Sequence, residues 1–173
     1  PHILHKSDAG GVRIGLETGE DIRRGFEDIL KNAKAFDPAA EIRGVLVSPM
    51  AGEGVEIIIG TKVDDQFGPI ILFGLGGVLV EVIRDVSFRV LPISPTAAKK
   101  MIQEIKAYPV LQGVRGRPPV DIKALRRLLL QCSDVVESYP DIQEMDLNPV
   151  IAHEKGLSIV DARILLKHEE SLS

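Results

Sequence analysis

Segments with the character of β-strands occur in groups along this chain and do not alternate one by one with helices. Strand-like runs cover residues 11–16 and much of 42–93, and they close the chain at 144–166, while helix-like patterns lie between these groups. Such segregation favours an α+β architecture, because consecutive strands can pair through short turns. The order therefore predicts a mostly antiparallel sheet with packed helices and argues against a doubly wound parallel sheet.

The individual strands are predicted from β-branched runs that are bounded by turn residues. A hairpin is expected where "AGEG", residues 51–54, joins the apolar runs on either side. A buried strand is expected at 67–77, because its apolar run enters a glycine loop. The predicted strands are "GVRIGL" (11–16), "IRGVLVSPM" (42–50), "GVEIIIGTKV" (54–63), "FGPIILFGLGG" (67–77), "VSFRVLPI" (86–93) and the two strands of the closing segment 144–166.

Amphipathic helices are predicted for residues 18–36, 94–108 and 121–139, where apolar residues recur with the period of a helix. Thr18 and Asp21 have the spacing of a capping box, which marks the start of the first helix. We expect each helix to bury one stripe of side chains. The stripe of the last helix contains Ile122, Leu125, Leu129, Cys132 and Val136.

Composition narrows the class of protein. The 173 residues are 45% hydrophobic, which is enough for one full core or two small ones. The formal net charge of −4 argues against nucleic acid as an obligate partner. The apolar run of residues 68–83 is interrupted by glycines and contains an acidic residue, so no membrane span is expected. The single cysteine, Cys132, excludes a disulfide within the chain and favours a cytoplasmic location.

Two glycine motifs are candidates for binding an anion. In the first, "HKSDAGGV", Gly10 and Gly11 allow backbone N–H groups to approach an anion, and Lys6 adds a positive charge. A glycine turn with solvated charges explains the same residues equally well. His5 is interpreted either as a nucleophile or as a side chain that faces solvent.

The second glycine motif, "FGLGGVLVE", follows a predicted buried strand. Gly76 and Gly77 belong to a set of three glycines within four residues, which exceeds the needs of a single tight turn. They are interpreted either as an anion cradle or as a place where two backbones pack closely. Glu81 projects from an otherwise apolar segment and is either a functional carboxylate or part of a salt bridge.

Oxygen-bearing side chains on the closing hairpin form the most specific candidate site. Asp146 and Asn148 share one face of a strand because they alternate, and a turn near Gly156 can bring Asp161 opposite Asn148. Mg²⁺ prefers oxygen ligands and takes one or two from the protein. The alternative is a solvated sheet edge. Glu56, at the head of an earlier strand, either accepts hydrogen bonds from a ribose or faces water.

These motifs together resemble one family. The similar stretches are "HKSDAGGV", the segment from "VEIIIG" to "VSFRVLPI", "AYPVLQGVRGRPPVDIKAL", "EMDLNPV" and "IVDARILL". They span nearly the whole chain, which resembles the ATP-grasp domain of ADP-forming acyl-CoA synthetases, such as the β subunit of acetate–CoA ligase. The resemblance implies an α+β ATP-grasp fold and an acid–thiol ligase. It further implies binding of ATP or ADP with Mg²⁺ and phosphoryl transfer between a phosphohistidine and the nucleotide.

The resemblance also implies roles for particular residues. His5 is similar to a residue that relays the phosphoryl group, and Glu81 is expected to orient its ring. Asn148 and Asp161 resemble the Mg²⁺ ligands. The residues Val45 to Ser48 resemble a strand that lines the adenine, and Glu56 resembles the ribose ligand. The full set of expected nucleotide contacts is Lys6, Gly10, Gly11, Val45, Leu46, Val47, Ser48, Glu56, Gly76 and Gly77.

One departure from the family pattern concerns the small amino-terminal lobe, of which only a tail is expected here. Residues 1–12 would be that tail, and residues 13–173 would be the main lobe with the glycine loop and the metal-binding hairpin. We therefore expect a chain that is catalytically incomplete alone and works in an oligomer with a CoA-binding α subunit or domain. The alternative is a non-catalytic, nucleotide-sensing module fused to an acetyltransferase, which the presence of His5, Asn148 and Asp161 disfavours.

Overall fold

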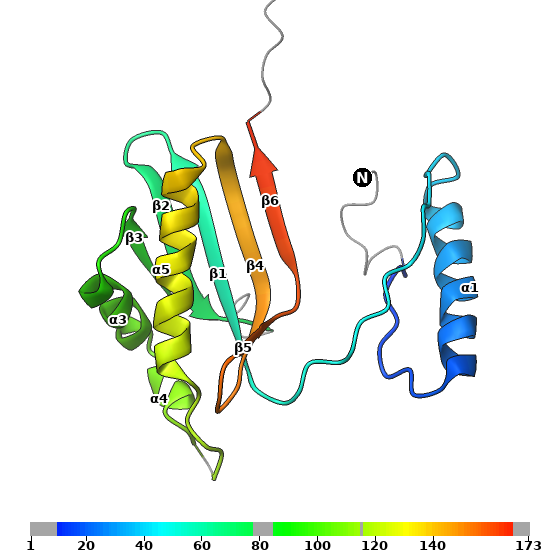
Figure 1. Ribbon diagram of the computed structural model, residues 1–173, viewed down its shortest axis with the longest axis horizontal. Helices are drawn as coiled ribbons and strands as arrows, with labels where there is room; N and C mark the ends of the chain where they lie inside the picture. The colour runs from blue at the N-terminus through cyan, green and yellow to red at the C-terminus, as the bar shows by residue number, and fades with distance from the viewer. Residues whose placement is uncertain (1–9, 78–84, 115, 168–173) are drawn as a thin grey trace, which may run out of the picture. The chain divides into compact units, whose positions relative to one another are not determined.

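A computed structural model describes residues 10–77, 85–114 and 116–167 (Figure 1). The chain divides into two compact units, residues 1–50 and residues 51–173. The larger unit contains a six-stranded antiparallel sheet with helices, so the predicted α+β fold is confirmed. Among the described helices, none is long and apolar enough to cross a membrane.

The smaller unit contains helix α1 (Gly19–Phe36). Thr18 Oγ1 accepts a hydrogen bond from the Asp21 backbone N–H at 3.1 Å, and the Asp21 carboxylate accepts one from the Thr18 N–H at 3.0 Å. This capping box satisfies N–H groups that have no partner within the first turn of the helix. The predicted start of the first helix is therefore confirmed.

The strands predicted at residues 11–16 and 42–50 are not formed, because neither segment has regular secondary structure in the described part of the smaller unit. Their apolar side chains stay exposed, with Ile14 at 74% and Leu46 at 91%. A strand needs a neighbour for its backbone N–H and C=O groups, and a strand-like pattern does not say where that neighbour is. The hairpin expected at 51–54 is also wrong, since the first strand begins at Val55 and pairs with other segments.

The sheet of the larger unit has the strand order β3-β2-β1-β4-β5, with β6 also paired to β4. All of these pairs are antiparallel. Helices α3 and α5 cover one face of the sheet (Figure 1). The strands are β1 (Val55–Asp64), β2 (Gly68–Leu75), β3 (Val86–Val90), β4 (Ile142–Ala152), β5 (Leu157–Ile159) and β6 (Ala162–Leu166). The helices are α3 (Pro95–Glu104), α4 (Tyr108–Leu111) and α5 (Ile122–Ser138).

The hairpin that the sequence prediction missed joins β1 to β2. The Asp64 carboxylate accepts hydrogen bonds from the backbone N–H groups of Gln66 at 2.9 Å and Phe67 at 3.0 Å. Gly68 follows with a φ of +74°, a conformation that side chains other than glycine rarely adopt. An aspartate that bonds to its own following backbone and a glycine with positive φ are common turn devices, so the signal was present in "DDQFG".

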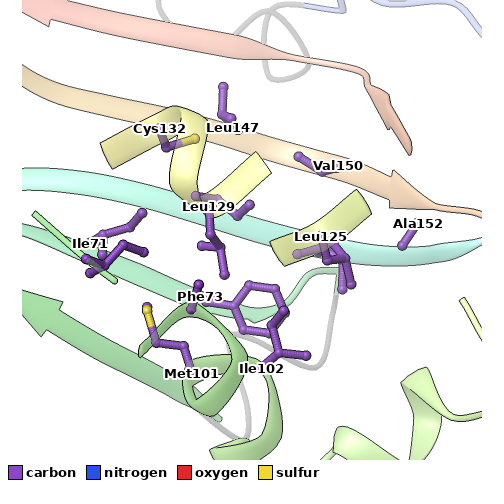
Figure 2. Packing of buried hydrophobic residues seen from close by; sticks show 14 of the residues in the cluster. Ile71, Phe73, Met101, Ile102, Leu125, Leu129, Cys132, Leu147, Val150 and Ala152 are labelled. Atoms are coloured by element: carbon purple, nitrogen blue, oxygen red, sulfur yellow. The ribbon is translucent and has the colours of Figure 1, made fainter. Parts of the chain in front are cut away.

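The core lies between the sheet and helices α3 and α5 (Figure 2). Phe73 of β2, Met101 of α3 and Leu129 of α5 are fully buried there. Cys132 belongs to the same cluster, as its place in the predicted apolar stripe indicates. Burial raises the pKa of the Cys132 thiol to about 12, so this thiol stays protonated at neutral pH.

Asp121 joins helix α5 to the strands at the other end of the chain. One oxygen of its carboxylate caps the helix by accepting a hydrogen bond from the Ala124 N–H at 2.9 Å. The other oxygen accepts a hydrogen bond from the Gly156 N–H at 3.1 Å. Since Gly156 lies in the turn between β4 and β5, one carboxylate fixes the start of the helix to the connection between two strands.

Candidate functional site

The face of the sheet away from helices α3 and α5 is called the open face here. Because successive side chains of a strand point to opposite sides, the residues between the buried ones belong to this face. In β1 the buried residues are Ile57, Ile59 and Thr61, and in β4 they include Met145 and Leu147. The open face therefore includes Glu56, Ile58, Gly60 and Lys62 of β1 and Glu144, Asp146 and Asn148 of β4.

Asn148 and Asp161 are direct neighbours across β4 and the start of β6. The Asn148 backbone N–H donates a hydrogen bond to the Asp161 carbonyl at 3.2 Å, next to the paired residues Leu147 and Ala162. Residues directly opposite each other in an antiparallel pair have their side chains on the same face. By this pairing, the side chains of Asn148 and Asp161 belong to the same face of the sheet.

A β-bulge in β4 lies at Asn148 and Pro149. Ile57 pairs with Val150 and Ile59 pairs with Leu147, so two residues of β4, Asn148 and Pro149, stand opposite one residue of β1. Leu147 and Val150 can then both face the core, where they are 6% and 0% exposed. Bulges commonly redirect a side chain next to a functional site. Here Asn148 lies on the open face by alternation with Asp146, and the bulge returns Val150 to the core.

Asp146 is a site candidate that the sequence prediction left out of its ligand set. It lies two residues before Asn148 on the open face and pairs with Arg163 of β6. Burial raises the pKa of the Asp146 carboxyl, and the negative charge of Glu144 raises it further. The alternation of Glu144, Asp146 and Asn148 was the signal that could have identified it.

The chemistry of these side chains fits a magnesium site with few protein ligands. Among the described residues, no group of three or more His, Cys, Asp and Glu side chains is placed to hold a metal ion. An asparagine oxygen and an aspartate carboxylate are nevertheless ligands that Mg²⁺ accepts, and water and phosphate oxygens ordinarily complete its shell. Asn148 and Asp161 are the residues of the open face that offer this pair side by side.

Glu56 lies against the described part of the second glycine motif. Its carbonyl accepts a hydrogen bond from the Gly76 N–H at 2.7 Å. A Cβ atom on Gly76 would lie 3.1 Å from the Glu56 Cβ, and one on Gly77, whose φ is +70°, would lie 2.7 Å from the Glu56 carboxylate. These glycines therefore have a packing role, which was one of the two interpretations, and they leave the Glu56 side chain exposed at the head of β1.

The predicted residues of the smaller unit line a cavity next to helix α1. Gly11 and the segment Val45 to Ser48 contribute to its wall, and its volume is about 980 Å³. Gly10 is held against the helix, because its carbonyl accepts a hydrogen bond from the Asn32 side-chain amide at 3.1 Å. The remaining predicted site residues, His5, Lys6 and Glu81, lie outside the described residues.

The antiparallel sheet with helices on one face is that of an ATP-grasp domain. The family model described as "ATP-grasp domain" matches residues 1–166. The chain therefore belongs to the ATP-grasp family, and the predicted fold and family resemblance are confirmed.

Named relatives narrow the comparison further. The chain is 51% identical over 170 residues to the β subunit of acetate–CoA ligase [ADP-forming] II of Pyrococcus furiosus. The matched stretch covers 96% of this chain and 72% of that subunit. A solved structure of the dinucleotide-forming acetyl-coenzyme A synthetase 1 of Ca. Korarchaeum cryptofilum, in complex with coenzyme A and Ca-AMPCP, matches with a TM-score of 0.93 and 51% identity over 96% of this chain and 73% of that one. The same enzyme with coenzyme A and Mg-AMPPCP has a phosphohistidine segment that points towards its nucleotide-binding site, and it matches with a TM-score of 0.84 and 47% identity over 96% of this chain and 73% of that one.

Proposed function

We propose that this chain is the nucleotide- and Mg²⁺-binding ATP-grasp part of an ADP-forming acyl-CoA synthetase. It transfers a phosphoryl group between a phosphohistidine and ADP or ATP. The observation that carries the proposal is the adjacency of Asn148 and Asp161 on the open face of the sheet. The identity of 51% to an acetate–CoA ligase β subunit and the nucleotide analogues bound to related structures support it.

Each predicted site residue has a place in this proposal. Asn148 and Asp161 hold Mg²⁺, and Glu56 binds the ribose. The adenine lies against the segment Val45 to Ser48. Gly76 and Gly77 shape the loop near Glu56. Lys6, Gly10 and Gly11 contact phosphate. His5 relays the phosphoryl group, and Glu81 orients its ring.

The transfer step needs little from the protein beyond position and charge. In the direction of ATP synthesis, an oxygen of the ADP β-phosphate attacks the phosphorus of the phosphohistidine. A new P–O bond forms, the P–N bond breaks, and the electron pair of that bond returns to the imidazole nitrogen. The bound Mg²⁺ supplies positive charge that offsets the phosphate oxygens. Asn148 and Asp161 fix where that charge stands relative to the nucleotide.

The chain is proposed to act together with a CoA-binding α subunit or domain in an oligomer. The name of the Pyrococcus relative, a β subunit, supports a second component. The acyl substrate binds to that component. A reducing, cytoplasmic location completes the proposal and rests on the single cysteine of the chain.

The experiment is a phosphorylation assay on the complete enzyme, that is, this chain with its CoA-binding component. The enzyme is incubated with γ-labelled ATP and Mg²⁺, and the protein is examined for label that is lost in acid and kept in base, as a phosphohistidine requires. We expect such label, and its transfer back to added ADP. Nucleotide binding without any label would overturn the enzyme proposal in favour of a nucleotide-sensing module.

A further inference from the structure

Helix α5 carries its exposed charges in the opposite order to the one that stabilises a helix. The peptide dipoles favour acidic side chains near the start of a helix and basic side chains near its end. In α5, the exposed Lys123 and Arg126 lie near the start, and the exposed Asp134 and Glu137 lie near the end. Apart from the capping Asp121, the first turn has no acidic residue, and the last turn has no basic one. These charges do not stabilise the helix, which indicates another role for them.

Helix α1 of the same chain shows the ordinary order of charges. It has Glu20 and Asp21 in its first turn and Lys34 in its last turn. Its Arg24 also forms an ion pair with Glu20, with 3.3 Å between Nη2 and Oε1. By contrast, no ion pair among the residues that the structure describes involves the four exposed charges of α5. The charges of α5 are therefore available to a partner outside the chain.

The four charges are arranged symmetrically about Leu130. Arg126 and Asp134 lie four positions before and after Leu130, and Lys123 and Glu137 lie seven positions before and after it. Residues at these spacings share one side of a helix. That side is opposite to the buried stripe of α5, and Leu130 at its centre is only partly buried. We call these five residues the α5 stripe, which has a basic half, an apolar centre and an acidic half.

The α5 stripe is complementary to a second copy of itself. When two such helices run antiparallel about a two-fold axis at Leu130, residues at equal distances from the axis stand opposite each other. Lys123 then faces Glu137 of the second copy, and Arg126 faces Asp134 of the second copy. Binding to a different protein requires no such symmetry, whereas an interface between two copies about a two-fold axis must be self-complementary. The symmetry of the stripe therefore favours a second copy of this chain as the partner.

We propose that the outer side of α5 is a two-fold interface between two copies of this chain. The inference does not depend on the proposed function, because it involves no nucleotide, metal ion or phosphoryl group. One helix face is a small interface, and charges across it determine orientation more than affinity. Exposed ion pairs also contribute little and are screened by salt. We therefore expect a weak association at low salt that becomes weaker as salt is added.

The first test measures self-association of the full chain by sedimentation velocity at low and high salt. Lys123→Glu with Arg126→Glu makes all charges of the stripe acidic, and Asp134→Lys with Glu137→Lys makes them all basic. Each double variant should associate at least about tenfold more weakly than the parent, because like charges then meet across the axis. An equimolar mixture of the two double variants should associate again. The fourfold variant should also associate, because its two halves are again complementary.

Lys31→Glu with Lys34→Glu is the matched control, because it makes the same change of charge at exposed positions of α1. It should associate like the parent. The Tm of each stripe variant should equal or exceed that of the parent, since the new charges follow the helix dipole. An equal loss of association in the control would assign the effect to net charge and overturn the proposal. A mixture of the two double variants that stays monomeric would overturn it as well.

The second test locates the interface in the complete enzyme. Leu130→Cys places a thiol at the proposed axis, while the native Cys132 is buried. A short bis-maleimide should link two copies of this chain in Leu130→Cys and none in Lys31→Cys. If the chain alone is monomeric, this cross-link decides, and its absence refutes the proposal. Loss of the CoA-binding component from the stripe variants, without loss of self-association, would assign the stripe to that component and also refute it.

Discussion

The covered face and the open face of the sheet are made from alternate residues of the same strands, but they differ in almost every property. On the covered face, Ile57 and Ile59 are fully buried against the helices. On the open face of β1, the residues between and beside them include Gly60 and the exposed Glu56. The neighbouring strand β4 carries the carboxylates of Glu144 and Asp146 on this face. One strand therefore contributes to the core and to the candidate site at successive positions.

This arrangement indicates that stability and chemistry can be changed separately in this domain. A substitution on the covered face removes buried apolar contacts and leaves the polar side chains of the open face in place. A substitution on the open face alters those polar side chains and leaves the core intact. The predictions that follow test this separation, and each has an outcome that would break it.

The largest effect is expected for Asp161→Asn on the open face. In the proposed function Asp161 is a charged Mg²⁺ ligand, and its replacement by a neutral side chain should slow phosphoryl transfer by about 10²–10⁴-fold, because charge on the transferred group is less well offset. The Tm should not change, since Asp161 lies outside the core. Single-turnover labelling at saturating Mg²⁺ measures the rate. The control Glu154→Gln makes the same change of charge at an exposed position in the β4–β5 connection and should have no effect. Equal losses in both variants would show that net charge, not the ligand pair, is responsible.

A substitution in the core between the covered face and helix α5 should lower stability and leave the labelling rate unchanged. Leu129 of α5 is 0% exposed, and Leu129→Ala should lower the free energy of unfolding by about 2–5 kcal/mol through lost contacts and a residual cavity. Urea denaturation measures this change, with Arg126→Ala on the exposed side of the same helix as control. The labelling rate per folded molecule should equal that of the parent. Loss of rate without loss of stability would mean that the two faces are coupled.

The sequence predicted those parts of the fold that depend on local periodicity. The stripe that contains Leu129 and Cys132 is buried as expected, and the capping box at Thr18 starts a helix. The strands expected at 11–16 and 42–50 failed, because strand formation depends on a partner segment that a local pattern does not identify.

Of the candidate site, the sequence indicated Asn148 and Asp161 as ligand candidates, and the structure brings the backbones of these two residues together. Their role as ligands stays a prediction. The closing hairpin with its turn near Gly156 was predicted and is formed by β4 and β5. The bulge at Asn148 was not predictable, because it depends on the register of β4 against β1, which is distant in the sequence.

A moderate effect is expected for Ser133→Ala in helix α5. This variant tests whether a buried polar group on the covered side of the sheet also serves only stability. Ser133 is 1% exposed, and its hydroxyl accepts a hydrogen bond from the Ile93 N–H at 3.1 Å. Removal of the hydroxyl leaves a buried donor without a partner, which should cost about 1–3 kcal/mol of the free energy of unfolding. Ser138→Ala, at an exposed position of the same helix, is the control in the same urea experiment. A variant as stable as the parent would show that the N–H finds another acceptor.

The smallest effect, and the one that most sharply tests the separation, is expected for Asp121→Asn. The N–H of Ala124 and the N–H of Gly156 hold the pKa of the Asp121 carboxyl below the ordinary value of 3.8. A lowered pKa in the folded protein stabilises the fold above the ordinary pKa, and this stabilisation is lost as the pH falls through the folded value.

The Tm of the parent should therefore exceed that of Asp121→Asn at pH 7, and the difference should shrink as the pH falls below 3.8. Thermal unfolding of both proteins across this range measures it. Because Asp121 connects helix α5 to the turn before β5, the same variant also asks whether the helix layer affects the strands that carry Asn148 and Asp161. An unchanged labelling rate at pH 7 would mean that these strands keep their register without the bond to the helix. A slower rate would mean that the covered side of the domain positions the ligands, and the two faces would then be separate in composition but not in function.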